Sequence, residues 1–361
     1  MALDIPSLAH WIANIYYHAE LGLLERAAQE TQQLGIQPET YVALRQLAAY
    51  EQHANYILST AHRQAIHDMH QLIEDAVNEG IAEAALDLQL LGHQARIMPL
   101  QQAIIENIAH ELTTSLQQLH YASLRHAVDA FREVQAIATG QTILGALTRQ
   151  QAAQYALDEF ARRGITMFVD KSGRKWSADT YAEMAVRTGT MRAQIDGRLS
   201  MYDSNGYDLV LVSDSPRECA LCRPWEYKVL TISGQPGTRT VPNMLTGGTT
   251  IVDVVATVDD ARADGLLHPN CTHDLRVYVP GATADTDTVD DPQLYELTQE
   301  QRYIERNIRL WERRRVAAIL PPARDMAERK LLEWEARLDT LIDSHSGLRR
   351  RPERENPFTA R

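Results

Sequence analysis

Residues 215–226, SPRECALCRPWE, hold Cys219 and Cys222, two of the three cysteines in this 361-residue chain. The third, Cys271, lies in HPNCTH at residues 268–273, with histidines on both sides. A Cys-x-x-Cys turn can direct both sulfur atoms at one ion, and tetrahedral zinc takes four cysteine or histidine ligands. The two clusters therefore predict one Zn²⁺ site that joins two loops far apart in the sequence.

Two histidines compete for the fourth position of this predicted site. His268 precedes Pro269, which fixes the backbone, whereas His273 follows Cys271 by two residues at the start of a strand-like run. Four protein ligands leave no open coordination position, so we expect a structural metal. The expected ligands are Cys219, Cys222, Cys271 and His273, with His268 as an alternative ligand or an orienting residue.

The residues after the Cys-x-x-Cys turn bear on two other interpretations. A redox dithiol normally opens a helix, but Pro224 and strand-like sequence follow here, which favours metal over redox chemistry. Trp225 is either a partner anchor or a ring that covers the metal loops. Small zinc domains have little core of their own, so we expect Trp225 to pack at the zinc loops.

Composition limits the class of protein. Hydrophobic residues make up 44% of the chain, yet no apolar run approaches the length of about 20 residues needed to span a membrane. Three cysteines cannot form a paired disulfide framework, so their spacing indicates a reducing compartment, and synthesis in the cytoplasm follows. The net charge of −12 disfavours general nucleic-acid binding, although the stretch from Glu296 to the end is net positive.

Hydrophobic spacing predicts helices through residues 1–163, as a bundle or an extended arm. Apolar residues recur at intervals of three and four, as at Ile105, Ile108 and Leu112. Glycine and proline suggest breaks at Gly35–Pro38, near Gly80 and at Gly92–Pro99.

Residues 164–281 predict a small α+β domain. A Lys-Ser-Gly turn at 171–173 predicts a hairpin, and YDLVLVSD, YKVLTISG and LRVYVPG read as strands. A helix is expected over residues 178–199 and a short one at Val258–Asp264. Residues 235–254 are rich in threonine and glycine and suggest a surface loop. The predicted fold class is thus α+β and predominantly helical, with a Cys/His zinc staple in the central domain.

The remaining sequence predicts three further segments. Residues 282–292 are acidic and rich in threonine, which is typical of a linker. Residues 293–345 predict a pair of charged helices, separated at Pro321 and Pro322 because proline ends one helix and can begin the next. Residues 346–361 are expected to form a flexible tail.

At this point the sequence resembles phage minor capsid protein 2, a family related to Mu-type head-morphogenesis proteins. The resemblance rests on DLVLVSDSPRECALCRPWEYKVLTISG at 208–234 and GLLHPNCTHDLRVYVPG at 265–281, and it extends over residues 165–345. Three positions depart from the family pattern. Tyr227 stands where a small residue such as glycine is expected, Thr272 where arginine is common, and Ser215 where a histidine often follows the aspartate.

The resemblance implies a structural virion component, made in the host cytoplasm and present in few copies. It would act in head morphogenesis near the portal or the packaged DNA. Its implied partners are the portal protein, the major capsid protein or both, with an oligomer on the portal as one arrangement. No membrane contact and no catalytic residues are expected.

Two alternative functions are an ADP-ribosyltransferase-like enzyme and a nucleic-acid-binding module. Mu-type head proteins suggest an ADP-ribosyltransferase-like fold, for which Arg187 and Ser213 match the first two catalytic residue types. The required late-strand glutamate is missing, because Glu333 and Glu335 lie in a predicted helix. A zinc-dependent nucleic-acid-binding module is the other alternative, but basic and acidic residues mix around the cysteines.

Two arginine runs are better candidates than the cysteine region for contact with DNA, in the form of weak, non-specific binding to packaged DNA. Arginines are strong phosphate ligands, but on helices they also pair with glutamates. The residues concerned are Arg313, Arg314, Arg315, Arg349, Arg350 and Arg351.

Overall fold

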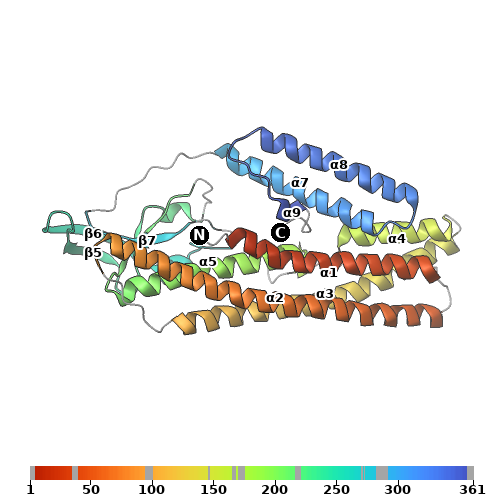
Figure 1. Cartoon of the computed structure of the whole chain (residues 1–361), viewed down its shortest axis with the longest axis horizontal. Coiled ribbons are helices and arrows are strands. Elements are labelled where there is room, and N and C mark those ends of the chain that lie inside the picture. The colour runs from red at the N-terminus through yellow and green to blue at the C-terminus, as the bar shows by residue number, and fades with distance from the viewer. Residues whose placement is uncertain are drawn as a thin grey trace. The chain divides into compact units, whose positions relative to one another are not determined.

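The chain forms two compact units, each assembled from three separate stretches of sequence, in a computed structural model (Figure 1). Unit 1 comprises residues 1–6, 69–112 and 184–295, and unit 2 comprises residues 7–68, 113–183 and 296–361. The structure describes residues 5–34, 40–93, 101–144, 147–164, 168–169, 175–215, 221–269, 271, 273–281 and 292–355. The expected linker at 282–292 therefore lies almost wholly outside the described residues.

Unit 2 is helical. It contains α1 (Ile5–Leu34) from Ser7 onward, the first part of α2 (Thr40–Leu90), most of α3 (Gln101–Ile143) and α4 (Arg149–Arg163). A hydrophobic core is formed by mostly small and aliphatic residues of these helices, and the rings of Tyr50 and Phe131 stack in it with centroids 4.2 Å apart. The helical prediction for this part of the sequence is confirmed.

The charged helices of unit 2 are α7 (Pro292–Val316) and α8 (Pro321–Asp343), which lie side by side in Figure 1. Pro321 begins α8, as its fixed backbone angle predicts. The two helices share a small core of Ile304, Ile308 and Leu338. The segment after α8 includes a buried Leu348 and the short α9 (Pro352–Glu355), so residues 348–355 pack on the unit instead of extending as a tail.

The break expected near Gly80 is wrong, because α2 runs without interruption from Thr40 to Leu90. A Cβ atom on Gly80 would lie 1.9 Å from the carbonyl oxygen of Gln194 in α5 (Ala178–Ser204). A Cβ on Gly197 of α5 would likewise lie 2.6 Å from the carbonyl oxygen of Val77. These glycines allow the backbones of α2 and α5 to approach within unit 1, which is why glycine is present inside the helices.

Unit 1 carries a mixed five-stranded sheet in the order β5-β6-β4-β3-β7. The strands are β3 (Leu209–Val212), β4 (Val229–Thr231), β5 (Gly237–Pro242), β6 (Thr249–Thr257) and β7 (Leu275–Val277). The pair β4–β6 is parallel and the other pairs are antiparallel. The short α6 (Val258–Ala263) follows β6. Unit 2 also contains a two-stranded antiparallel hairpin, β1 (Phe168–Val169) with β2 (Lys175–Trp176), and the turn predicted between them lies outside the described residues.

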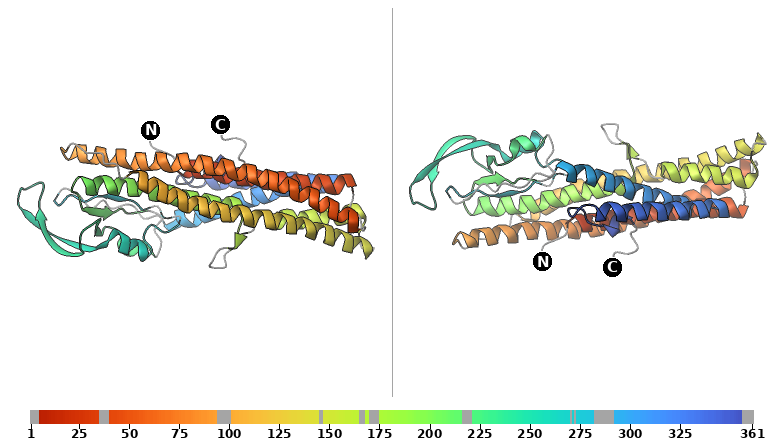
Figure 2. Two further views of the ribbon diagram at one scale, coloured as in Figure 1. Left: turned by 90° about the horizontal axis from the view of Figure 1, so that it is seen from below. Right: turned by 90° about the horizontal axis from the view of Figure 1, so that it is seen from above.

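Strands β5 and β6 form a long ribbon, visible from two further sides in Figure 2. The expectation of a surface loop over residues 235–254 is therefore wrong for most of that segment. Val252, Val254 and Ala256 alternate with exposed residues and are buried, which is the period of a strand with one covered face.

The hydrogen bonds of Asp208 explain why an aspartate precedes β3 and why an Ile-Ser-Gly sequence follows β4. Its carboxylate accepts hydrogen bonds from the Thr231 hydroxyl (2.6 Å), the Arg239 guanidinium (2.7 Å) and the backbone amides of Ser233 and Gly234. Partial burial alone would raise the pKa of Asp208, but these hydrogen bonds outweigh it and lower the pKa to about 2. The carboxylate thus links β3, β4 and β5.

None of the helices within the described residues combines the length and apolar character that a membrane crossing requires.

Candidate metal centre

Two neighbouring strands bring the cysteine loops together. β3 and β7 pair antiparallel, with Val212 opposite Leu275, so the loop that leaves β3 and the loop that enters β7 lie at the same end of the sheet. Cys222 precedes a one-turn 3₁₀-helix at Arg223–Trp225, and Cys271 lies four residues before β7. The strand pairing therefore positions residues separated by 49 positions.

The sulfur atoms of Cys222 and Cys271 are 3.5 Å apart and both side chains are buried. The ligand atoms of Cys222, Cys271 and His268 all lie within 4.8 Å of one another. This group can therefore hold a metal ion, and two thiolates with an imidazole form a donor set that suits zinc. Cys219, the other cysteine of the predicted set, lies outside the described residues.

His273 also contacts the cluster. Its Nδ1 atom is 3.2 Å from the Cys271 sulfur, and its Nε2 atom is 2.6 Å from a carboxylate oxygen of Glu226. Burial alone would lower the pKa of His273, but hydrogen bonding to Cys271 and Glu226 raises it to about 9. Burial alone would raise the pKa of the Cys271 thiol, and hydrogen bonds from His273 reverse this so that the net direction is downward.

The contacts of the two histidines leave opposite ring nitrogens for a metal. Nδ1 of His268 is 2.8 Å from the Pro269 carbonyl oxygen, which leaves Nε2 for a metal. His273 is held at Nε2 by Glu226, which leaves Nδ1. A hydrogen bond from the second ring nitrogen to a carboxylate or carbonyl is the usual way in which proteins orient a ligating histidine. Both histidines thus have the surroundings of a ligand, and the choice between them stays a prediction.

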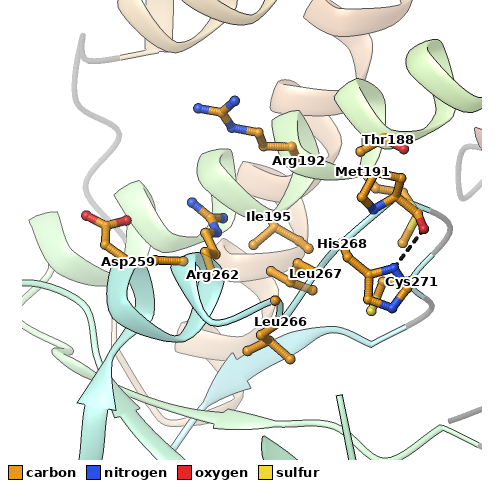
Figure 3. A pocket seen from close by; sticks show the side chains of 13 residues that line it. Thr188, Met191, Arg192, Ile195, Asp259, Arg262, Leu266, Leu267, His268 and Cys271 are labelled. Carbon is orange, nitrogen blue, oxygen red and sulfur yellow. Dashed lines mark hydrogen bonds between the residues drawn. The ribbon is translucent and has the colours of Figure 1, made fainter. Parts of the chain in front are cut away.

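A cavity of about 550 Å³ opens beside the cluster (Figure 3). It lies between α5, α6 and the loop that carries His268 and Cys271, and Met191, Ile195 and Leu266 contribute apolar walls. Cys271 lines this cavity, whereas Cys222 does not. Trp225, expected to pack at the zinc loops, is half-buried in the 3₁₀-helix that follows Cys222.

A buried arginine contacts the residues at which the His268–Cys271 loop enters β7. Arg198 of α5 is 1% exposed and forms ion pairs with Glu83 of α2 and with Asp274, the residue after His273. It also donates to the Leu275 carbonyl oxygen at 3.3 Å. Sequence reasoning missed both Arg198 and the role of Glu226, because no local pattern links residues this far apart in the chain.

Tyr227 adopts a backbone φ of +60°, in the left-handed region that favours glycine. This explains why the family pattern leads one to expect a small residue at this position. The other two departures are less informative, since Thr272 lies outside the described residues and Ser215 is buried next to Asp214.

Most of the arginines expected near DNA make contacts within the chain. Arg313 pairs with Glu20 at 3.5 Å, Arg314 lies over the Trp311 ring and Arg315 pairs with Glu312 at 2.7 Å. Arg350 pairs with Asp339 and Glu355, while Arg349 is exposed and Arg351 half-exposed. Contact with packaged DNA stays a prediction.

The residues that match an enzyme's catalytic types lie at a strand end and in helices. The Ser213 hydroxyl accepts a hydrogen bond from the Asp274 amide at 2.9 Å. Arg187 lies within α5, and Glu333 and Glu335 lie in α8, which is the predicted helix.

Comparison with known proteins supplies the family. A family model for "Phage minor capsid protein 2" matches residues 5–343. A "Structural protein" of Lactococcus phage LL-H is 27% identical over 225 residues, which cover 60% of this chain and 58% of that relative. No solved structure matches the chain. Both names point to a structural phage protein, a component of the virion, and not to an enzyme. The chain belongs to the phage minor capsid protein 2 family.

Proposed function

We propose that this protein acts in head morphogenesis, as a minor structural component that contacts the portal protein and, next to it, the major capsid protein. The family match over residues 5–343 carries the proposal. The chain spans 58% of the relative from the Lactococcus phage, which is named only as a structural protein, so the partners are part of this proposal.

The β5–β6 ribbon supports a role in protein contacts. Ile251 is 73% exposed and Leu245, in the turn, is 71% exposed. Val255 and Met244 add to the exposed apolar surface of the same ribbon. Several exposed apolar residues on one surface element are a feature of interaction sites. We assign the contact with other virion proteins to this ribbon.

Incorporation into heads tests this assignment. Leu245→Asp and Ile251→Asp, combined in one phage genome, should abolish packaging of the protein into purified heads, as measured by quantitative mass spectrometry. Leu332→Asp on α8, where the side chain is 66% exposed, is the matched control and should be incorporated normally. Circular dichroism of the purified variants checks that each folds. Equal incorporation of a folded ribbon variant would contradict the assignment, and cross-linking in heads identifies the partner.

We further propose that a structural Zn²⁺ staples the central α+β domain, with Cys219, Cys222, Cys271 and His273 as ligands. His268 is the alternative ligand or an orienting residue. The contact between the two buried sulfurs and the Glu226–His273 hydrogen bond support this proposal. When bound, zinc would hold the two loops together, and it would supply stability because this geometry is lost in the unfolded chain.

Elemental analysis of the purified protein tests the staple, with one zinc per chain as the expected result. Cys222→Ser should lose the metal and lower the unfolding temperature of the central domain. His273→Gln and His268→Gln distinguish the two histidines, because only the ligand variant should lose zinc. His53→Gln, on an exposed face of α2, is the control. Absence of zinc from the wild-type protein prepared without chelators would contradict the proposal.

A further inference from the structure

The two buried thiols are placed for a second reaction when no metal is bound. The sulfur atoms of Cys222 and Cys271 touch at 3.5 Å, and neither cysteine is part of a disulfide. The backbone amide of His273 donates to the Cys271 sulfur at 3.4 Å, which fixes that sulfur in place. The two sulfurs are already in contact, so no other atom separates them. A small shift of either loop would therefore bring them to bonding distance.

Access from solvent distinguishes the two sulfurs. Cys271 lines the cavity of about 550 Å³, which is large enough for small solutes such as hydrogen peroxide (Figure 3). Cys222 is completely buried and does not line that cavity. An oxidant that enters the cavity therefore meets Cys271 first, while the Cys222 sulfur, 3.5 Å away, is placed to react with the product.

We propose that Cys271 is a peroxide-reactive thiol in the metal-free protein and that Cys222 resolves it, giving an intramolecular Cys222–Cys271 disulfide. The reaction rests on the proposed zinc staple, because bound metal would occupy both sulfurs and protect them from the oxidant. The oxidant class is a hydroperoxide, with hydrogen peroxide as the simplest case.

The reaction balances in two steps. The Cys271 sulfur attacks one peroxide oxygen, so that an S–O bond forms and the O–O bond breaks. Cys271 becomes a sulfenic acid, and the other oxygen leaves as water with the thiol proton. The Cys222 sulfur then attacks the sulfenic sulfur, so that the S–S bond forms and the S–O bond breaks. A second water leaves with the Cys222 proton, and two electrons have passed from the thiols to the peroxide.

The two thiols would meet oxidising conditions once the virion leaves its host. A particle released from its host leaves the reducing cytoplasm, where thiols are kept reduced. Loss of the metal outside the cell would then be followed by a disulfide between the same two loops. The staple would be replaced by a covalent bond, and the sheet end at β3 and β7 would stay closed.

The test uses the full-length protein, either loaded with Zn²⁺ or stripped with a chelator under reductant. After removal of the reductant, both samples receive a small excess of hydrogen peroxide, and non-reducing peptide mapping by mass spectrometry identifies the linkage. The stripped protein should lose two of its three thiols and give a Cys222–Cys271 linked peptide. The zinc-loaded protein should keep its thiols under the same conditions.

Variants separate the roles of the three cysteines. Cys219→Ser should still form the Cys222–Cys271 linkage. Cys222→Ser should stop at a sulfenic acid on Cys271, which dimedone traps. The wild-type peptide map does not depend on either variant folding.

A main product that links Cys219 to Cys222, dimedone on Cys222 in place of Cys271, or no loss of thiols would each overturn the proposal. Mixed linkages from a stripped chain that unfolds would overturn it as well. Failure of the zinc staple is read separately, from elemental analysis of the untreated protein, and leaves the result for the stripped protein standing.

Discussion

Nε2 of His273 and a carboxylate oxygen of Glu226 lie 2.6 Å apart, on the side of the imidazole that faces away from Cys271. The carboxylate therefore fixes the ring orientation while Nδ1 points at the sulfur. This is the arrangement that raises the basicity of a ligating histidine.

Glu226→Gln should weaken zinc binding by about 10- to 100-fold, since loss of such an orienting carboxylate typically costs that much affinity. Competition with a chromophoric chelator measures the affinity. Glu333→Gln on the exposed surface of α8 is the control and should bind zinc like the wild type. An unchanged affinity in Glu226→Gln would exclude His273 as the ligand that Glu226 orients and would favour His268.

Gly80→Ala should destabilise the protein by about 1–3 kcal/mol, because a methyl group cannot fit against the Gln194 carbonyl without moving α2 away from α5. Gly140→Ala is the matched control in α3, where a Cβ atom meets nothing within 4 Å. That change should stabilise the helix by about 0.5–1 kcal/mol, since alanine is the better helix former. Urea unfolding followed by circular dichroism measures both, and equal effects would contradict the close-approach explanation.

At position 227, glycine should be more stable than alanine by about 1 kcal/mol, because the backbone φ of +60° strains any residue with a Cβ atom. Comparing Tyr227→Gly with Tyr227→Ala cancels the loss of the tyrosine ring, which both variants share. Thermal unfolding of the two variants gives the difference. A more stable alanine variant would mean that the turn relaxes to an ordinary backbone conformation.

Asp208 should make stability depend on pH in the acid range. Its folded pKa of about 2 lies below the value of about 3.9 for an unfolded aspartate, so the unfolded chain binds the proton more readily. The contribution, about 2 kcal/mol, is complete above pH ~4 and is lost as the pH falls through ~2.

Asp208→Asn should therefore be less stable than the wild type at neutral pH, and the difference should shrink toward pH ~2. Unfolding free energies over this pH range provide the measurement. Asp253→Asn, on the exposed face of β6, is the control. A difference between Asp208→Asn and the wild type that does not change with pH would rule out the carboxylate charge as its source.

Local sequence signals predicted part of the fold. Apolar periodicity indicated the helices, and Pro321 marked the start of α8, because these features depend on neighbours in the chain. The helix break predicted at Gly80 is wrong for the same reason. Gly80 allows close contact with Gln194, and sequence spacing cannot distinguish such a glycine from one that breaks a helix. Residues 235–254 were misread because threonine and glycine suggested a loop, although Val252 and Val254 alternate as in a strand.

The candidate metal centre was partly predictable. The short spacing of Cys219 with Cys222 and of Cys271 with its histidines indicated ligand pairs directly. The partner of His273 could not be predicted, because Glu226 is 47 residues away and only the β3–β7 pairing brings the two together.

The β3–β7 pairing also determines when the protein can close during its synthesis. Leu211 of β3 pairs with Arg276 of β7, so the sheet lacks its last strand until the ribosome has delivered that residue. Cys271 follows Cys222 by 49 positions, a length of chain that takes roughly 2–10 s to translate at about 5–20 residues per second. Throughout that interval the nascent chain carries Cys222 without Cys271 and one uncovered edge of β3, and an unpaired strand edge can pair wrongly with other strands.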